Sequence, residues 1–153
     1  FLIIDNYKKI RNFKNIRNNI SYVPQNTFLI DGSFKENITL GVSEDKIKPE
    51  LLDKCIKLSS LESLIDSSPH GFDTQIGERG IKVSGGQLQR IALARALYSE
   101  KDILIFDEFT SALDEKIEKN ILKNIKNLSK IKTIIISSHS KNAISICDKI
   151  VNF

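Results

Sequence analysis

Two continuous apolar runs, residues 103–106 and residues 134–136, constrain the fold of this chain more than any other feature. Uninterrupted runs of this kind are typical of parallel strands that are covered on both faces. Between them, residues 114–128 place Ile117, Ile121 and further apolar side chains on one stripe of a helix, with lysines elsewhere on its surface. Strand, amphipathic helix and strand in this order predict a right-handed unit of a parallel sheet. We therefore expect an α/β fold.

The rest of the pattern also alternates between strands and helices. Short apolar runs bounded by polar residues predict strands at residues 1–4 and 20–23. Residues 48–61 have a helical pattern whose proline falls in the first turn, where proline is tolerated. Residues 88–98 form another predicted helix, which is apolar or small almost all round and should lie inside the protein. The stretch 67–80 is rich in Ser, Pro, Gly and Asp and is predicted to be a loop.

The composition fits one globular domain or a part of one: the chain has 153 residues, of which 41% are hydrophobic and 27% are charged. No apolar run approaches the roughly 20 residues that a membrane-spanning helix needs. The net charge of +4 is modest, and the densest basic stretch, residues 8–17, is interleaved with apolar residues. This pattern favours a solvated amphipathic surface over a nucleic-acid-binding patch. Cys55 and Cys147 lack metal-ligand spacing and are expected to be buried, reduced thiols.

Acidic and imidazole side chains follow the two apolar runs directly. Asp107 and Glu108 come after the first run, and His139 comes shortly after the second. Taken alone, the acid pair is equally compatible with a helix cap or a salt bridge, and a single histidine favours a structural role. Because ligands collect beyond the carboxyl ends of parallel strands, we expect all three residues at one edge of the sheet.

A second group of candidate site residues, Ser84, Gly85, Gly86 and Gln87, stands where the helix predicted at 88–98 begins. Two glycines after a serine let backbone N–H groups approach an anion, and the positive N-terminus of the helix points at the same anion. Paired acids after a buried strand, in turn, provide oxygen ligands for magnesium and orient a water molecule. The two features together predict nucleoside-triphosphate chemistry.

The order of these segments closely resembles that of the ABC-type ATPases. The resemblance implies a P-loop NTPase (RecA-like) ABC ATPase core, with a parallel sheet flanked by helices, plus an α-helical signature subdomain. Five motifs carry it, nearly spanning the chain: the Q-loop at 22–25, the signature at 83–97, the Walker B strand at 103–108, the D-loop at 110–114 and the switch histidine His139.

The resemblance also implies roles for these residues, with ATP as the nucleotide and Mg²⁺ as the metal. Asp107 and Gln25 would hold Mg²⁺, Glu108 would polarise the attacking water, and His139 would contact the γ-phosphate. In the family, the signature acts on ATP held by the second nucleotide-binding domain of a head-to-tail dimer. The resemblance assigns nucleotide binding to Gln25, Ser84, Gly85, Gly86, Gln87 and Asp114, the last of which would couple the two composite sites.

Some parts of the family pattern are missing or altered. No G-x-x-x-x-G-K-[ST] phosphate loop occurs in the sequence, and the aromatic residue that stacks on adenine cannot be placed. The first residue is not methionine, so we expect a fragment that lacks its N-terminal part and cannot hydrolyse ATP alone. Phe109 stands where many relatives have a small residue. The partial ABC ATPase domain at 1–153 is expected to comprise core strands and Q-loop at 1–40, a helical subdomain with X-loop and signature at 41–98, and a core with Walker B, D-loop and switch histidine at 99–153.

Two further segments resemble exporter-type ABC transporters. Residues 77–80, including Glu78 and Arg79, resemble the X-loop of this class, and residues 28–38 resemble the stretch after its Q-loop. In that class the Q-loop and X-loop face a transmembrane domain, which usually lies upstream in the same polypeptide, and the ATPase works at the cytoplasmic face of the membrane. Apolar residues at the second segment fit a surface for a partner helix or, alternatively, ordinary core positions: Phe28, Leu29 and Phe34.

Soluble ABC ATPases that act on DNA or on ribosomes are the alternative reading. Heads that act on DNA contain long coiled-coil insertions, whereas here the Q-loop and signature are separated by a compact segment without heptads. Ribosome-acting proteins typically lack the pattern at 77–80. We therefore expect ATP binding and hydrolysis that drive export across a membrane, with no nucleic acid as a partner.

Overall fold

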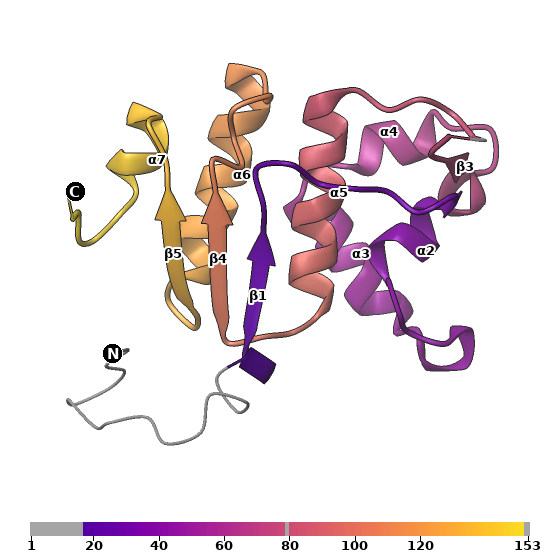
Figure 1. Ribbon diagram of the computed structural model, residues 1–153, viewed down its shortest axis with the longest axis horizontal. Coiled ribbons are helices and arrows are strands. Elements are labelled where there is room, and N and C mark those ends of the chain that lie inside the picture. Colours follow the sequence, from indigo (N-terminus) through magenta and orange to yellow (C-terminus); the bar gives the residue numbers. More distant parts are fainter. Residues whose placement is uncertain (1–16, 79, 152–153) are drawn as a thin grey trace.

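A three-stranded parallel sheet forms the centre of the chain in the computed structural model, which describes residues 17–78 and 80–151. The strands β1 (Ile20–Val23), β4 (Ile103–Asp107) and β5 (Thr133–Ser137) lie in the order β1-β4-β5. Their arrows point the same way in Figure 1. The predicted parallel sheet is confirmed, and the strand predicted at 1–4 lies outside the described residues.

Helix α6 (Glu115–Leu128) connects β4 to β5, as the apolar stripe predicted. Its inward face buries Ile121 and Ile125 almost completely, whereas its lysines are exposed or half-buried. The Asp114 side chain caps the helix by accepting a hydrogen bond of 3.0 Å from the Ile117 N–H group. The short helix α7 (Lys141–Ser145), which the sequence analysis did not predict, follows β5 and is capped by Ser140.

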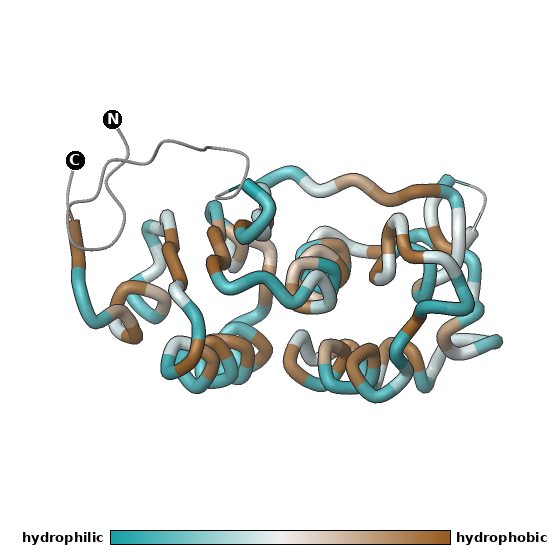
Figure 2. Tube along the Cα trace, turned by 90° about the horizontal axis from the view of Figure 1, so that it is seen from below, coloured by the Kyte–Doolittle hydropathy of each residue, from teal (hydrophilic) through white to brown (hydrophobic). Residues whose placement is uncertain are grey.

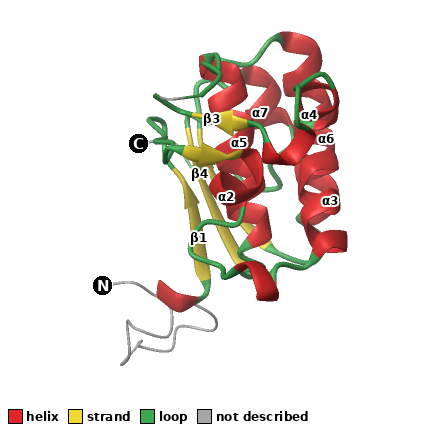
Figure 3. Cartoon of the chain, turned by 90° about the vertical axis from the view of Figure 1, so that its right-hand side faces the viewer, coloured by secondary structure: helices red, strands yellow, loops and turns green. Residues whose placement is uncertain are grey.

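The two faces of the sheet differ in their burial. Leu104 and Phe106 of β4 are 1% and 0% exposed and point at the helices, which lie to one side of the strands in Figure 3. On the opposite face Ile105 is only partly buried, and Ile135 of β5 is 52% exposed. The expectation that both faces are covered is therefore wrong for the described residues, because their helices pack on one face.

Helix α5 (Gly85–Tyr98) joins the sheet to the helical part of the molecule. Figures 1 and 2 show the sheet at one end of the long axis, the helical part at the other, and α5 between them. Ile91 and Ala94 of α5 are fully buried, and the helix contacts both β1 and α3 (Pro49–Leu58). The prediction of an interior helix at this place is confirmed, and Pro49 stands in the first turn of α3 as expected.

The helical part is made of short elements. Besides α3, it contains the helices α2 and α4, two 3-10 turns, and a small antiparallel ladder between β2 and β3. The stretch 67–80, predicted as a loop, contains one of the turns and β3. These elements are β2 (Gly32–Ser33), α2 (Phe34–Ile38), η1 (Glu44–Lys46), α4 (Glu62–Asp66), η2 (Gly71–Asp73) and β3 (Gln75–Ile76).

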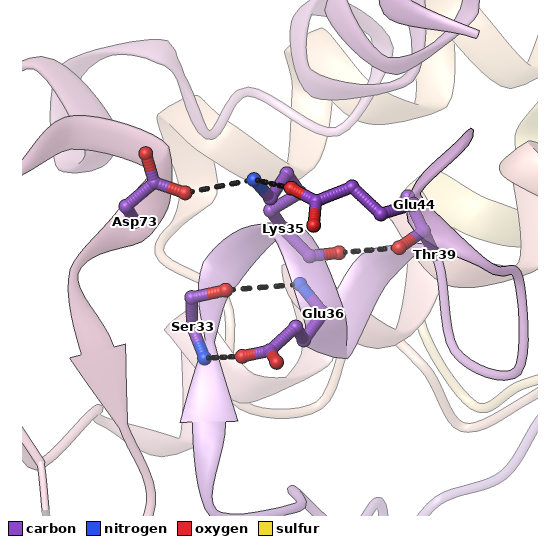
Figure 4. Close-up of polar contacts among 6 residues, drawn as sticks. All are labelled: Ser33, Lys35, Glu36, Thr39, Glu44 and Asp73. Atoms are coloured by element: carbon purple, nitrogen blue, oxygen red, sulfur yellow. Dashed lines mark hydrogen bonds and ion pairs between the residues drawn. The ribbon is translucent and has the colours of Figure 1, made fainter. Parts of the chain in front are cut away.

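Helix α2 is short but is fixed by reciprocal caps. The Ser33 hydroxyl accepts from the Glu36 N–H at 3.1 Å, and the Glu36 carboxylate accepts from the Ser33 N–H at 2.7 Å. Lys35 in the same turn pairs with Glu44 at 3.1 Å and with Asp73 at 3.0 Å, so it connects α2 to both 3-10 turns (Figure 4).

The apolar residues after the Q-loop are divided between core and surface. Phe34 is 1% exposed and lies in the core, so its interpretation as a surface residue was wrong. Leu29 is partly buried and packs against the same core, whereas Phe28 is 62% exposed. Ser33 caps α2 at the residue before Phe34, and this cap fixes the first turn of the short helix whose Phe34 side chain is buried.

Both cysteines are free thiols, as expected. Cys55 is buried in α3, and burial raises the pKa of its thiol to about 12, so it stays protonated at physiological pH. Cys147 is only partly buried, which differs from the expectation, and its thiol donates to the Ala143 carbonyl at 3.4 Å.

Candidate functional site

The carboxyl ends of β4 and β5 bring the predicted catalytic residues together. In the register of the sheet, Asp107 stands opposite Ser137, so Glu108 and His139 follow the two strands at the same edge. The His139 Nε2 atom lies 3.8 Å from the Glu108 Oε1 atom. The His139 side chain is fully exposed, whereas that of Glu108 is 23% exposed, so the imidazole lies on the solvent side of the carboxylate.

The backbone at Glu108 has an uncommon conformation that fixes this carboxylate at the edge. Its φ angle is +45°, in the left-handed region that non-glycine residues rarely adopt. The Glu108 N–H group donates to the Ser137 carbonyl at 2.9 Å, and its carbonyl accepts from the Ser111 N–H at 3.2 Å. Phe109 then turns inward, 1% exposed, with its ring centroid 4.7 Å from that of Phe106. The large residue at position 109 is therefore a core residue.

Asp107 is bonded to the end of the neighbouring strand. The Tyr22 hydroxyl of β1 donates to Asp107 Oδ2 at 2.8 Å. This hydrogen bond raises the pKa of Tyr22, with smaller contributions from desolvation and from the charge of Asp107. Gln25, two residues after β1, is exposed. The sequence analysis placed Tyr22 only as part of the Q-loop motif, and its bond to Asp107 could not be predicted without the order of the strands.

The predicted signature residues form the start of α5. The Ser84 hydroxyl accepts from the Gln87 N–H at 3.3 Å, and the Gln87 side chain accepts from the Ser84 N–H at 2.7 Å. Ser84 and Gly85 are exposed, and Gly86 and Gln87 are partly buried. In a helix the first N–H groups have no partner one turn earlier, so those of Gly85 and Gly86 face outward from the capped end.

Contacts within the chain connect this helix end to the D-loop. A Cβ atom on Gly86 would lie 2.6 Å from the Ala112 carbonyl oxygen, so only glycine allows this approach. Gln89, one turn further along, is 6% exposed and binds two D-loop groups. Its Nε2 donates to the Ser111 hydroxyl at 3.0 Å, and its Oε1 accepts from the Ala112 N–H at 3.0 Å.

Gln89 is the residue of this region that the sequence analysis missed. Its polar side chain stands among apolar residues in a helix predicted to be buried, and this contrast could have marked it as a residue with specific partners. Arg90, the next residue, gives the same signal: it is 8% exposed and donates to the Ser60 and Gly86 carbonyls. Burial lowers the pKa of Arg90, and the nearby Asp114 carboxylate acts in the opposite direction. Asp114 itself caps α6, as described above.

The segment after the Q-loop is held against the same helix by Arg95. Its guanidinium donates to the Phe28 carbonyl from both terminal nitrogens at 3.2 Å and to the Asn37 carbonyl from Nε at 2.8 Å. It also lies over the Phe28 ring, 5.1 Å from the centroid. The exposed Phe28 therefore has a fixed position despite its contact with water.

The predicted X-loop lies beside this segment. Gly77 has φ +106°, and a Cβ atom there would lie 2.8 Å from Asp31 Oδ1, so both its conformation and its space require glycine. The exposed Glu78 donates its backbone N–H to the same Asp31 oxygen at 2.8 Å. Arg79 lies outside the described residues.

Comparison with known proteins relates this arrangement to a family. The sequence matches the ABC transporter family over residues 3–111. The lactococcin-G-processing and transport ATP-binding protein LagD of Lactococcus lactis subsp. lactis is 39% identical over 146 residues, covering 95% of this chain and 20% of that protein. The ATP-dependent lipid A-core flippase of Desulfotalea psychrophila is 39% identical, covering 89% of this chain and 23% of that protein.

A solved structure gives the same result. A bacterial Atm1-family ABC exporter with ATP bound has a TM-score of 0.76 and 36% sequence identity, covering 84% of this chain and 22% of that chain. The chain thus spans less than a quarter of the length of the two relatives and of this exporter chain. It belongs to the ABC transporter family and has the ABC ATPase fold that the order of its motifs predicted.

Proposed function

We propose that this chain is the ATP-binding and ATP-hydrolysing part of an exporter-type ABC transporter, which drives a substrate across a membrane. The observation that carries the proposal is the approach of Glu108 Oε1 and His139 Nε2 to 3.8 Å beside Asp107 at one sheet edge. The names of the relatives, which describe transport, processing and flipping, and the likeness to an exporter structure support the export class.

In the proposed reaction a water molecule attacks the γ-phosphorus of ATP. The bond from this phosphorus to the β,γ-bridging oxygen breaks, which gives ADP and inorganic phosphate. Glu108 orients the water and accepts its hydrogen bond, and His139 donates a hydrogen bond to a γ-phosphate oxygen. Their distance of 3.8 Å lets one phosphate group and its water contact both side chains.

The donor set at the edge suits Mg²⁺, because this ion prefers oxygen ligands and takes few of them from the protein. Asp107, with Gln25 beside the end of β1, would hold the ion. Mg²⁺, when bound, neutralises charge on the β- and γ-phosphate oxygens. Within residues 17–78 and 80–151 no group of three His, Cys, Asp or Glu side chains could hold a metal ion unaided. The substrate phosphates and water would therefore supply the remaining ligands.

The start of α5 is proposed to bind the γ-phosphate of a second nucleotide. Ser84, Gly85, Gly86 and Gln87 lie at a helix N-terminus, where N–H groups and the helix dipole favour an anion. The capping box arranges the Ser84 and Gln87 side chains around that end. A head-to-tail dimer would place this end on the ATP of a second nucleotide-binding domain, with Asp114 and the D-loop between the two sites.

A transmembrane domain is the second proposed partner. Its contact would include Glu78 and Arg79 of the X-loop and the surface hollow beside α2. This hollow, of about 410 Å³, is lined by the apolar Ile30, Leu40 and Val42 and by the Lys35 ion pairs. Such a mixture of apolar and charged groups suits a helix end from the membrane part. No helix among the described residues has the length and apolar character needed to cross a bilayer.

The proposal also concerns the side of the membrane on which the chain works and its ATPase activity when isolated. The chain would act at the cytoplasmic face of the membrane, because ATP is available there. It would not hydrolyse ATP alone, because its sequence contains no G-x-x-x-x-G-K-[ST] loop to hold the β- and γ-phosphates.

The test is Glu108→Gln in the full-length protein that carries this chain. Gln keeps the size of the side chain but removes the basic carboxylate, so the ATPase rate should fall by about 10²–10⁴-fold. ATP binding should remain, measured with a fluorescent nucleotide. Glu62→Gln, an exposed residue of α4, is the matched control and should keep the rate. Undiminished turnover in Glu108→Gln would contradict the proposed role.

A further inference from the structure

Glu118 of α6 is a buried carboxylate that the proposed mechanism does not use. It is 8% exposed, and both of its oxygens accept hydrogen bonds. The Ser140 hydroxyl donates to Oε1 at 2.7 Å and the Asn142 amide donates to Oε2 at 2.7 Å. The buried Thr110 side chain lies near the same carboxylate and lowers its pKa. The backbone N–H group of Glu118 also donates to the Asp114 carbonyl at 2.8 Å and so continues the first turn of α6.

The partners of Glu118 come from the two segments that carry the proposed catalytic pair. Ser140 directly follows His139, and Thr110 stands two residues after Glu108. One side chain therefore bonds to the segment of His139 and lies beside that of Glu108, while Glu108 and His139 approach each other outside. This connection adds to the backbone bond from the Glu108 N–H to the Ser137 carbonyl, which ends before His139.

The His139 side chain has few other constraints. It is fully exposed, and the contact that the structure gives its Nε2 atom is the approach to Glu108 Oε1 at 3.8 Å. Its direction therefore depends on the backbone of residues 138–140. The Ser138 hydroxyl accepts from the Ser140 N–H at 3.0 Å, and the Ser140 hydroxyl accepts from the Ala143 N–H at 3.4 Å while donating to Glu118. Glu118 is the only acidic group among these contacts of the described residues.

The charge of the Glu118 carboxylate strengthens the hydrogen bonds that hold these segments. Burial raises the pKa of Glu118, but the hydrogen bonds from Asn142, Ser140 and Thr110 together outweigh it, so the pKa is below its ordinary value. The group is therefore ionised at neutral pH. Bonds to an ionised acceptor are short and about twice as strong as those between neutral groups, which makes the geometry that they impose rigid.

We propose that Glu118 is a positioning residue, which holds the segments of Glu108 and His139 at the separation that ATP hydrolysis requires. The proposal rests on the function proposed above. It extends that function inward, because Glu118 contacts neither water nor nucleotide in the proposed reaction. Supporting residues of this kind change activity through the geometry of others, commonly by about 10–100-fold when they are replaced.

The first test measures kcat and KM for ATP in the full-length protein with Glu118→Gln. Gln has the same size but turns an amide N–H₂ group toward donors, so at least one of the bonds from Ser140 and Asn142 fails. We expect kcat to fall about tenfold and KM to change less than about twofold, since nucleotide binding does not use Glu118. Glu115→Gln, an exposed residue one turn earlier on α6, should leave both unchanged. Unchanged kcat in Glu118→Gln would overturn the proposal.

A double variant separates positioning from simple loss of structure. In Glu118→Gln with Asn142→Asp the carboxylate and amide exchange places, so the bond between positions 118 and 142 can form again with its charge. We expect kcat to return to within about threefold of the starting value. If kcat and KM deteriorate together in Glu118→Gln and the double variant restores neither, the residue is only structural and the proposal is wrong.

Glu108→Gln, measured in parallel, separates failure of the positioning role of Glu118 from failure of the proposed function. Loss of hydrolysis in Glu108→Gln with normal kcat in Glu118→Gln would overturn only the positioning role. Normal hydrolysis in Glu108→Gln would overturn the proposed function, and the positioning role with it.

Discussion

The two ends of the candidate site are built in different ways. At the sheet edge, Glu108 and His139 come from separate strands and meet only because β4 and β5 are parallel neighbours in register. At the start of α5, Ser84 and Gln87 are three residues apart and are organised by a local capping box. The first arrangement depends on the whole sheet, whereas the second requires only one helix turn. Changes in the core should therefore disturb the edge sooner than the capped helix end.

The D-loop is the place where these two ends are connected. Gln89 and Gly86 fix it to α5, and its Thr110 lies beside Glu118, which bonds to the segment of His139. Hydrogen bonds thus connect the signature helix to the D-loop and Glu118 to the segment of His139, and Thr110 lies where these two sets of bonds meet. Four changes, from the largest expected effect to the smallest, test how the sheet edge differs from the start of α5 and whether the D-loop connects them.

Replacing His139 by Ala should have the largest effect, and on activity alone. The side chain is fully exposed, and besides its 3.8 Å approach to Glu108 it would contact only the reacting phosphate, so the ATPase rate should fall by about 10²-fold without a change in the thermal unfolding midpoint. His70, the other histidine of the sequence, is exposed and lies far from the edge along the chain, so His70→Ala is the control. A large loss of stability in His139→Ala would mean that this exposed side chain also stabilises the sheet edge.

Replacing each glycine of the signature turn by alanine should show that Gly86, but not Gly85, is required for packing against the D-loop. In Gly86→Ala the new Cβ atom would lie 2.6 Å from the Ala112 carbonyl oxygen, so the turn and the D-loop must move apart, at a cost of about 2 kcal/mol. In Gly85→Ala the nearest atom is the Ala112 Cβ at 3.4 Å, and the cost should be near zero or reversed. Thermal unfolding of both variants checks this, and equal losses would contradict it.

Cutting the Gln89 bonds should loosen the D-loop. Gln89→Leu leaves the Ala112 N–H and the Ser111 hydroxyl without these partners, which should cost about 1–2 kcal/mol and speed hydrogen exchange at Ala112. Gln87→Leu removes only an exposed cap of the Ser84 N–H and should cost about 0.5 kcal/mol with no change at Ala112. Hydrogen exchange of equal speed in both variants would show that Gln89 is not the connection.

Lowering the pH should protonate the Glu118 carboxylate and weaken its hydrogen bonds to Ser140 and Asn142. Because its pKa is lowered from 4.5 in the folded state, its contribution to stability is complete above pH 4.5 and is lost as the pH falls through the folded-state pKa. Unfolding midpoints measured between pH 6 and pH 3 should therefore fall less steeply in Glu118→Gln than in the unchanged protein. Identical slopes would mean that the ionised carboxylate is not stabilised by its hydrogen-bond partners.

The sequence predicted the parts of this molecule that depend on long patterns. The apolar runs at 103–106 and 134–136 and the stripe of α6 were sufficient for the parallel sheet and its crossover, because such patterns reflect burial on whole elements. The edge position of Glu108 and His139 followed from the same rule. Short elements such as α2 were missed, since five residues carry too little periodicity to stand out.

Tertiary contacts were the second limit of prediction. Phe34 and Phe28 have the same side chain, yet one is buried and the other is held outside by Arg95. Only the packing of α2 against α5 distinguishes them. In the same way, the bonds of Gln89 and Glu118 join segments more than twenty residues apart, and no local pattern marks their partners.

The left-handed backbone of Glu108 implies that stability and activity conflict at this position. A glutamate with φ +45° costs the folded state about 1 kcal/mol compared with a residue that adopts this conformation freely. Replacement by glycine should relieve that cost and make the protein harder to unfold, while removing the carboxylate that we propose orients the attacking water. The same residue would thus lower stability and supply activity.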